Sequence, residues 1–144
     1  ENPIKIVEEF KNVLPVKIYN RALYVTQENK RTLKAANYLK KKDLKGFGEC
    51  LYRSHHGLQH LYEVSCKELD FLVAQTKALD FVVGSRMMGG GFGGCTINIV
   101  HKDKVGEFIE TVSAAYEEKH AIKLSSIITT ISDGVKKIEY GVSN

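Results

Sequence analysis

The chain has 144 residues, of which 43% are hydrophobic and 26% are charged, a composition close to that of ordinary soluble domains. A chain of this length can bury a core without a disulfide or a metal, so we expect one domain, and no apolar run approaches the roughly 18 residues of a membrane span, so no membrane partner is expected. The net charge of +4 is spread along the chain and gives little reason to expect a nucleic-acid partner.

The first half of the sequence predicts helices, because apolar residues recur at helical spacing and no strong turn dipeptide interrupts them. A short segment lies between Pro3 and Pro15, a long helix follows over about residues 18–39, and another is expected over 43–62 with its first residue as a cap. The centre of the long helix, residues 26–32, is polar on every side. Two interpretations are open: a solvated turn or local break in the helix, or a continuous helix whose centre lines a polar cleft. The first is favoured.

A third helix is predicted to begin at Ser65 and to end near Leu79, since Ser65 and Glu68 have the spacing of a capping box. The period of the apolar residues then changes to two. Residues 81–87 and 95–99 therefore predict two strands that pair as a hairpin around a glycine-rich loop.

The last part of the chain predicts one more helix and one more hairpin. The helix begins at Asp103, and residues 127–131 and 135–138 are predicted strands on either side of the turn Asp133-Gly134. This order of elements indicates an α+β domain in which helices pack on an antiparallel sheet of two hairpins.

Five of the six residues at positions 89–94 are glycine, which is more than a simple turn needs. Glycines accept positive φ, so their amides can converge on a phosphate or on a developing negative charge, and they also let another segment approach closely. Taken alone, the loop favours neither anion binding nor packing. Gly89, Gly91 and Gly94 fit G-x-G-x-x-G, but a strand follows where a dinucleotide site needs a helix. The sequence also lacks the partner motifs of protein kinases and the Walker loop.

The segment around this loop, GSRMMGGGFGGCT at residues 84–96, resembles the third signature of galactokinases, which belong to the GHMP kinases. Residues 21–31 and 43–70 are similar to further galactokinase stretches, in the same order along the chain. The resemblance spans about residues 16–138 and implies the GHMP kinase C-terminal domain, a ferredoxin-like type of α+β fold. The chain departs from the family pattern at Leu23, Tyr24, His60 and Met88.

Galactokinases have two domains, so the resemblance implies that residues 1–144 form a single C-terminal domain and that the N-terminal domain, with the catalytic carboxylate, is absent from this chain. It implies a cytoplasmic parent enzyme that phosphorylates galactose to galactose 1-phosphate with ATP and Mg²⁺, both held mainly by the N-terminal domain. Galactose, ATP and that domain are the expected partners, and this chain is expected to hold no catalytic residue and no metal. The residues expected at the nucleotide and substrate cleft are Arg86, Gly89, Gly90, Gly91, Phe92, Gly93 and Gly94. Valine at Gly91 or Gly93 should then impair phosphoryl transfer more than folding.

Other functions stay open at this point. The full-length protein could be a catalytically silent galactokinase-like sensor of sugar and ATP, and the chain could be a stand-alone anion-binding domain. Two roles are also open to Arg86: an electrostatic contact to the reacting phosphate, or an ordinary ion pair behind the hairpin, which is favoured.

The remaining cysteines and histidines indicate no further chemistry. Three cysteines without C-x-x-C spacing predict reduced cytoplasmic thiols, with Cys95 buried in its strand; the others are Cys50 and Cys66. His55 lies on an apolar helical stripe and is predicted to be a hydrogen-bonded core histidine. His56 and His60 have the i, i+4 spacing of zinc ligands, but no further ligand lies nearby in the sequence, so no zinc is expected.

Overall fold

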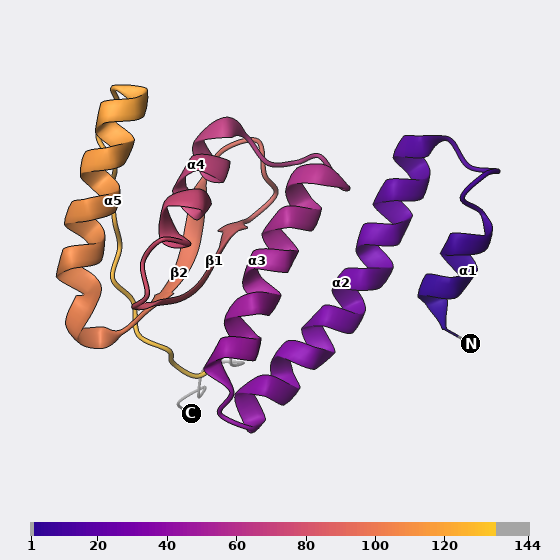
Figure 1. Ribbon diagram of the computed structural model, residues 1–144, viewed down its shortest axis with the longest axis horizontal. Coiled ribbons are helices and arrows are strands. Elements are labelled where there is room, and N and C mark those ends of the chain that lie inside the picture. The colour runs from indigo at the N-terminus through magenta and orange to yellow at the C-terminus, as the bar shows by residue number, and fades with distance from the viewer. Residues whose placement is uncertain (1, 135–144) are drawn as a thin grey trace, which may run out of the picture.

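The computed structural model of the chain describes residues 2–134. Its elements in chain order are α1 (Pro3–Glu9), α2 (Val16–Lys40), α3 (Leu44–His60), α4 (Lys67–Thr76), β1 (Val82–Met88), β2 (Cys95–Val100), the short 3₁₀ helix η1 (Lys102–Lys104) and α5 (Val105–His120). Figure 1 shows α1, α2 and α3 in a row that continues into the hairpin and α4, with α5 at the end opposite α1.

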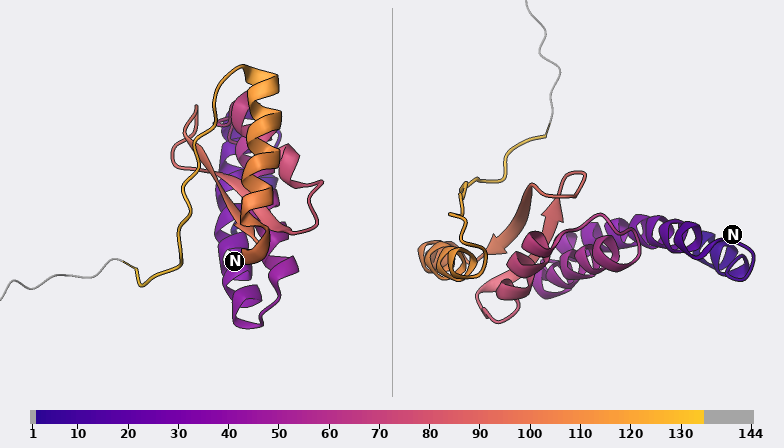
Figure 2. Two further views of the ribbon diagram at one scale, coloured as in Figure 1. Left: turned by 90° about the vertical axis from the view of Figure 1, so that its left-hand side faces the viewer. Right: turned by 90° about the horizontal axis from the view of Figure 1, so that it is seen from above.

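The two strands form an antiparallel hairpin that is covered by helices. Gly84 lies opposite Ile99 and Met88 lies opposite Cys95, and the register shifts between Val82 and Gly84. α3 and α4 pack against the hairpin, mostly against β1, and the view from above in Figure 2 shows the helices to one side of the sheet. The loop at residues 89–94 therefore leaves the sheet at the end of a strand that helices hold in place.

Two glycines allow α3 to lie directly against β1. A Cβ on Gly48 would lie 1.7 Å from the Val83 carbonyl oxygen, and a Cβ on Gly84 would lie 2.7 Å from the Gly48 Cα. Both distances are shorter than side chains tolerate, so the two backbones can approach this closely only because Cβ atoms are missing. The contact fixes α3 against the strand that leads into the glycine loop.

Two clusters of buried side chains form the core. The first joins α2, α3, α4 and β1 and consists of Tyr24, Leu58, Leu69 and Met87. The second joins α4 to α5 and consists of Leu72, Val112 and Tyr116. Burial of these apolar side chains at about 1.5–3 kcal/mol each supplies the main favourable contribution to the fold.

The α+β class and the first hairpin are confirmed, and so is the Asp43 cap, whose carboxylate accepts a 2.9 Å hydrogen bond from the Gly46 amide. The break expected within residues 26–32 is wrong, because α2 is continuous. The capping box at α4 is also wrong. Cys66 is the N-cap there, and the Ser65 hydroxyl instead donates to the Asp70 carboxylate at 2.6 Å.

The second hairpin is not formed in the part of the chain that the structure describes. Residues 127–131 carry no strand, and Ile127 and Ile131 are 92% and 101% exposed. A strand needs a partner for its backbone groups, and within residues 2–134 the sheet contains only β1 and β2. The other predicted arm, residues 135–138, lies outside the described residues.

None of the helices within the described range is both long enough and apolar enough to cross a membrane. α2 is the longest of them, and it carries charged side chains along its whole length.

Candidate functional site

The loop at residues 89–94 follows a backbone path that demands glycine. The φ angle is +87° at Gly89, +89° at Gly91, +139° at Gly93 and +94° at Gly94, a region that residues with a Cβ rarely adopt. Phe92 also has a positive φ, of +59°, and is 78% exposed at the tip of the loop. The number of glycines in the loop thus has a conformational cause.

Gly91 is required by packing as well. The Phe92 amide donates a 2.7 Å hydrogen bond to the Val64 carbonyl, and a Cβ on Gly91 would lie 2.1 Å from the same oxygen. A Cβ on Gly89, Gly90 or Gly93 would meet no atom within 4 Å, and no residue between 2 and 134 accepts a hydrogen bond from their amides. Packing explains Gly91, whereas open space and unpaired donors suit the other three positions to an anion.

Glu28, at the centre of α2, connects three elements behind the loop. Its Oε1 accepts a 2.5 Å hydrogen bond from Ser54 Oγ and lies 3.8 Å from Arg86 Nη1, while its Oε2 contacts the Arg31 guanidinium. Arg86 also donates from Nε to the Met87 carbonyl at 3.0 Å. Arg86 therefore forms the ion pair that the sequence favoured, and its contact to a reacting phosphate stays a prediction.

The polar centre of α2 is thus part of a cluster inside the protein and is not a solvated turn. The side chains of Glu28 and Arg31 are only 21% and 16% exposed. Tyr24, one of the departures from the family pattern, lies beside this cluster with its ring against Gly57 and 5.2 Å from the Tyr62 ring. Burial, with the Glu28 carboxylate adding to it, raises the pKa of Tyr24, so the phenol stays neutral.

His55 is buried, as predicted, and joins α3 to the start of the loop. Its Nδ1 accepts a 3.2 Å hydrogen bond from the Met87 amide, and its Nε2 lies 3.1 Å from Asp70 Oδ1. The acceptor role of Nδ1 places the ring proton on Nε2, facing the carboxylate that also accepts from Ser65. Burial lowers the pKa of His55 below its ordinary value of 6.5, and Asp70 opposes this shift without cancelling it.

We expect the free energy of unfolding to fall as the pH is lowered through about 6.5. Because the pKa of His55 is lowered in the folded chain, the unfolded chain binds this proton first. The neutral ring stabilises the fold fully above the unfolded-state pKa, and that contribution is lost as the pH falls toward the folded-state pKa. Urea unfolding at about pH 7.5 and pH 5.5 measures the difference.

His55→Gln should reduce this pH dependence, and His101→Gln, at an exposed position, should leave it unchanged. Part of the dependence should remain in His55→Gln, because burial also lowers the pKa of His56. An undiminished dependence in folded His55→Gln would show that His55 does not cause it.

Residues 35–118 match the family model described as GHMP kinases C terminal. The chain belongs to the GHMP kinase family. The resemblance found in the glycine motif and its flanking stretches is therefore confirmed.

This GHMP kinase chain is 48% identical to a galactokinase of Clostridium acetobutylicum over 133 residues, which is 91% of this chain and 34% of that protein. It is 44% identical to a galactokinase of Clostridium beijerinckii over the same shares of both chains. Among solved structures it is similar to Lactococcus lactis galactokinase complexed with galactose, with a TM-score of 0.79 and 34% identity over 83% of this chain and 31% of that chain. The chain spans about a third of the length of the curated relatives it matches.

The sequence of this GHMP kinase chain did not reveal that Glu28 pairs with Arg86, or that Ser54 donates a hydrogen bond to Glu28. The sequence did contain a signal for this cluster: residues 26–32 form a polar run at the centre of a long helix, and such a run predicts polar partners on a neighbouring element. The prediction for Cys95 is wrong: it is exposed, because α3 and α4 cover mainly β1 and leave the start of β2 open.

The two histidines at zinc-like spacing lie close together, with ring centroids 4.5 Å apart, on the exposed side of α3. Among the residues that the structure describes, no three His, Cys, Asp or Glu side chains gather where they could hold a metal ion. The expectation that the chain binds no zinc stays a prediction.

Proposed function

We propose that this chain is the C-terminal part of a cytoplasmic galactokinase, which transfers a phosphoryl group from ATP to galactose and forms galactose 1-phosphate. The observation that carries the proposal is the match to galactokinases, such as the one that is 48% identical over 91% of this chain. The solved galactokinase that resembles this fold has galactose bound, which supports the choice of sugar.

The residues of this chain fit a role beside the phosphates of ATP, which supplies the transferred group. At Gly89, Gly90 and Gly93 a Cβ would meet open space, and no residue from 2 to 134 accepts from their amides; amide donors are worth about 1.5–3 kcal/mol each toward a charged oxygen. Glu28 and the Met87 carbonyl hold Arg86 at the base of the loop. As the resemblance to galactokinases implies, the ligands of Mg²⁺ are assigned to the N-terminal domain of the proposed enzyme.

The surface around the loop is suited to a partner domain. Three large apolar side chains near the loop are exposed: Met88 by 49%, Phe92 by 78% and Ile97 by 40%. They also lie close to one another along the hairpin. Large apolar side chains gathered in this way are typical of a surface that another domain covers. The N-terminal domain of the full-length enzyme is the proposed partner.

The proposal predicts that the chain alone phosphorylates no galactose and that joining it to a galactokinase N-terminal domain produces activity. The N-terminal part of the Clostridium acetobutylicum galactokinase is fused in front of this chain, in place of that enzyme's own C-terminal part. Formation of ADP in the presence of galactose is then measured, with the unaltered relative as the control. Because catalysis of phosphoryl transfer depends on positioning and charge stabilisation from both sides of a cleft, only the fused protein should turn over.

Phosphorylation of galactose by the purified chain above the rate without protein would contradict the proposal that the catalytic residues lie in the N-terminal domain. A fused protein that folds and binds ATP and galactose but makes no product would contradict the enzymatic function and favour the sensor.

A further inference from the structure

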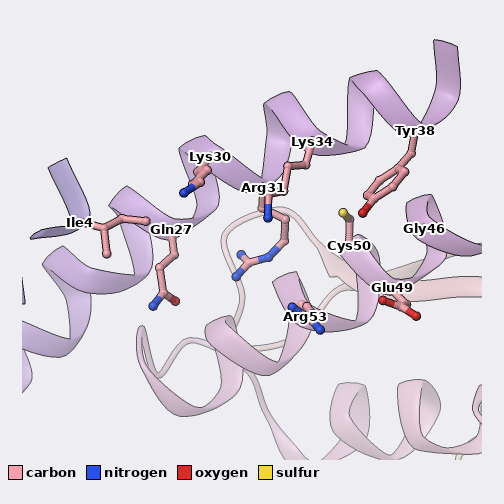
Figure 3. A pocket seen from close by; sticks show the side chains of 10 residues that line it. All are labelled: Ile4, Gln27, Lys30, Arg31, Lys34, Tyr38, Gly46, Glu49, Cys50 and Arg53. Carbon is pink, nitrogen blue, oxygen red and sulfur yellow. The ribbon is translucent and has the colours of Figure 1, made fainter. Parts of the chain in front are cut away.

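A cavity of about 320 Å³ lies between α1, α2 and α3, away from the glycine loop. Figure 3 shows its lining, with Arg31 extending from α2 toward Arg53 on α3. The charged lining residues are Lys30, Arg31 and Lys34 from α2 and Glu49 and Arg53 from α3. Four cations and a single carboxylate thus line one small cavity.

Most of this positive charge is not compensated within the described residues. Arg31 contacts Glu28, which offsets its charge. Lys30, Lys34 and Arg53 form no ion pair with any residue from 2 to 134. Lys30 and Lys34 are also one helical turn apart, a spacing at which like charges destabilise a helix. The chain thus maintains a cationic cavity at a cost in stability, although it has 17 acidic residues that could have lined it.

The cavity also has walls that fix its shape. The Tyr38 ring lies against Gly46, where a Cβ would be only 2.6 Å from the ring carbons. Cys50 is 8% exposed and forms part of the lining, and burial raises the pKa of its thiol although Arg31, Lys34 and Arg53 oppose the shift. Lys30, Lys34 and Arg53 are exposed, so an anion can reach them directly from solvent, and at short range their attractions for it add together.

We propose that this cavity binds a phosphate-bearing small molecule. The planar guanidinium of Arg53 can donate two hydrogen bonds to phosphate oxygens, and the ammonium groups of Lys30 and Lys34 supply charge from the facing helix. The site is separate from the proposed cleft. Its α3 residues lie between Gly46 and Arg53, whereas the glycine loop contacts Val64, which follows the end of that helix.

The test is calorimetric titration of the 144-residue chain at low ionic strength with pyrophosphate, ATP and a hexose monophosphate in separate experiments. Saturable binding of at least one of them is expected, with a Kd of about 1 mM or tighter. The NMR signal of the Arg53 Nε–H group should shift with the same saturation. Similar affinities for pyrophosphate and ATP assign the site to the phosphate groups alone, and clearly tighter binding of ATP assigns it to a nucleotide.

The variant with Lys34→Gln and Arg53→Gln should bind at least about tenfold more weakly. Lys40→Gln is the control, because it removes a positive charge from α2 outside the cavity and should alter the affinity less than about twofold. The proposal is overturned if none of the three anions binds saturably, or if Lys40→Gln weakens binding as much as the double variant does.

It is also overturned if binding shifts the NMR signals of the amides of residues 89–94 and leaves the signal of Arg53 unchanged. This measurement uses the unaltered chain, so it does not depend on whether a variant folds. None of these measurements depends on galactose phosphorylation, so their outcome is independent of the proposed enzyme activity.

Discussion

Replacing Gly48 by alanine should lower the free energy of unfolding by about 2–3 kcal/mol. The added Cβ would lie 1.7 Å from the Val83 carbonyl oxygen, which belongs to the backbone of β1 and cannot rotate away as a side chain could. α3 and β1 would have to separate, and Val83 lies between the core residue Val82 and the second glycine of the contact, Gly84. The gain from replacing glycine within a helix, about 0.5–1 kcal/mol, offsets only part of this loss. For a domain stable by about 5–15 kcal/mol, the change is large.

Urea unfolding of the 144-residue chain measures this effect, and Gly106→Ala in α5 is the matched control. A Cβ on Gly106 would meet no atom within 4 Å, so the same substitution there should raise stability by a few tenths of a kcal/mol. Equal stability of Gly48→Ala and the unaltered chain would show that α3 and β1 do not approach each other this closely.

Gly91→Val should reduce galactose phosphorylation by the fused protein by about 30- to 150-fold, equivalent to about 2–3 kcal/mol. Two causes act together: φ is +89° at this residue, and a Cβ would lie 2.1 Å from the Val64 carbonyl oxygen. The clash also displaces the Phe92 amide from that oxygen, so the loop loses its contact with the segment that follows α3. The structure thereby changes the expectation drawn from the sequence, since valine here disturbs the folding of the loop itself.

Gly90→Ala separates loop geometry from ligand contact. Gly90 has no positive φ, and a Cβ there would meet no atom within 4 Å, so the loop should keep its conformation. Its turnover, measured by ADP formation, should fall less than that of Gly91→Val, because the Cβ only narrows the open space proposed for the anion and leaves the loop path intact. Turnover of Gly91→Val at the level of Gly90→Ala would mean that neither the loop conformation nor its contact with Val64 matters for transfer.

The sequence by itself determined the helices of the first half, the Asp43 cap, the first hairpin and the family. Each depends on residues that are near one another in the chain: apolar side chains at helical spacing, a carboxylate three residues before the amide it caps, or a compact glycine motif between two alternating segments. It also placed His55 in the core, because that residue shares a stripe with Leu51 and Leu58.

Only the tertiary structure decided what the polar and glycine residues contact. Glu28 reaches Ser54 and Arg86 because α2 packs against α3, which in turn packs against β1. Gly91 is restricted by Val64, a residue far from it in the sequence, and Cys95 is exposed because the helices cover mainly the other strand.

Contacts between distant segments also decide why residues 127–131 form no strand. Isoleucine and threonine there favour a strand, but a strand forms only when another segment pairs with its backbone, and none does within residues 2–134. Local patterns state which conformation a segment prefers. Which contacts it makes depends on how distant elements pack, and a pattern within one segment does not contain that information.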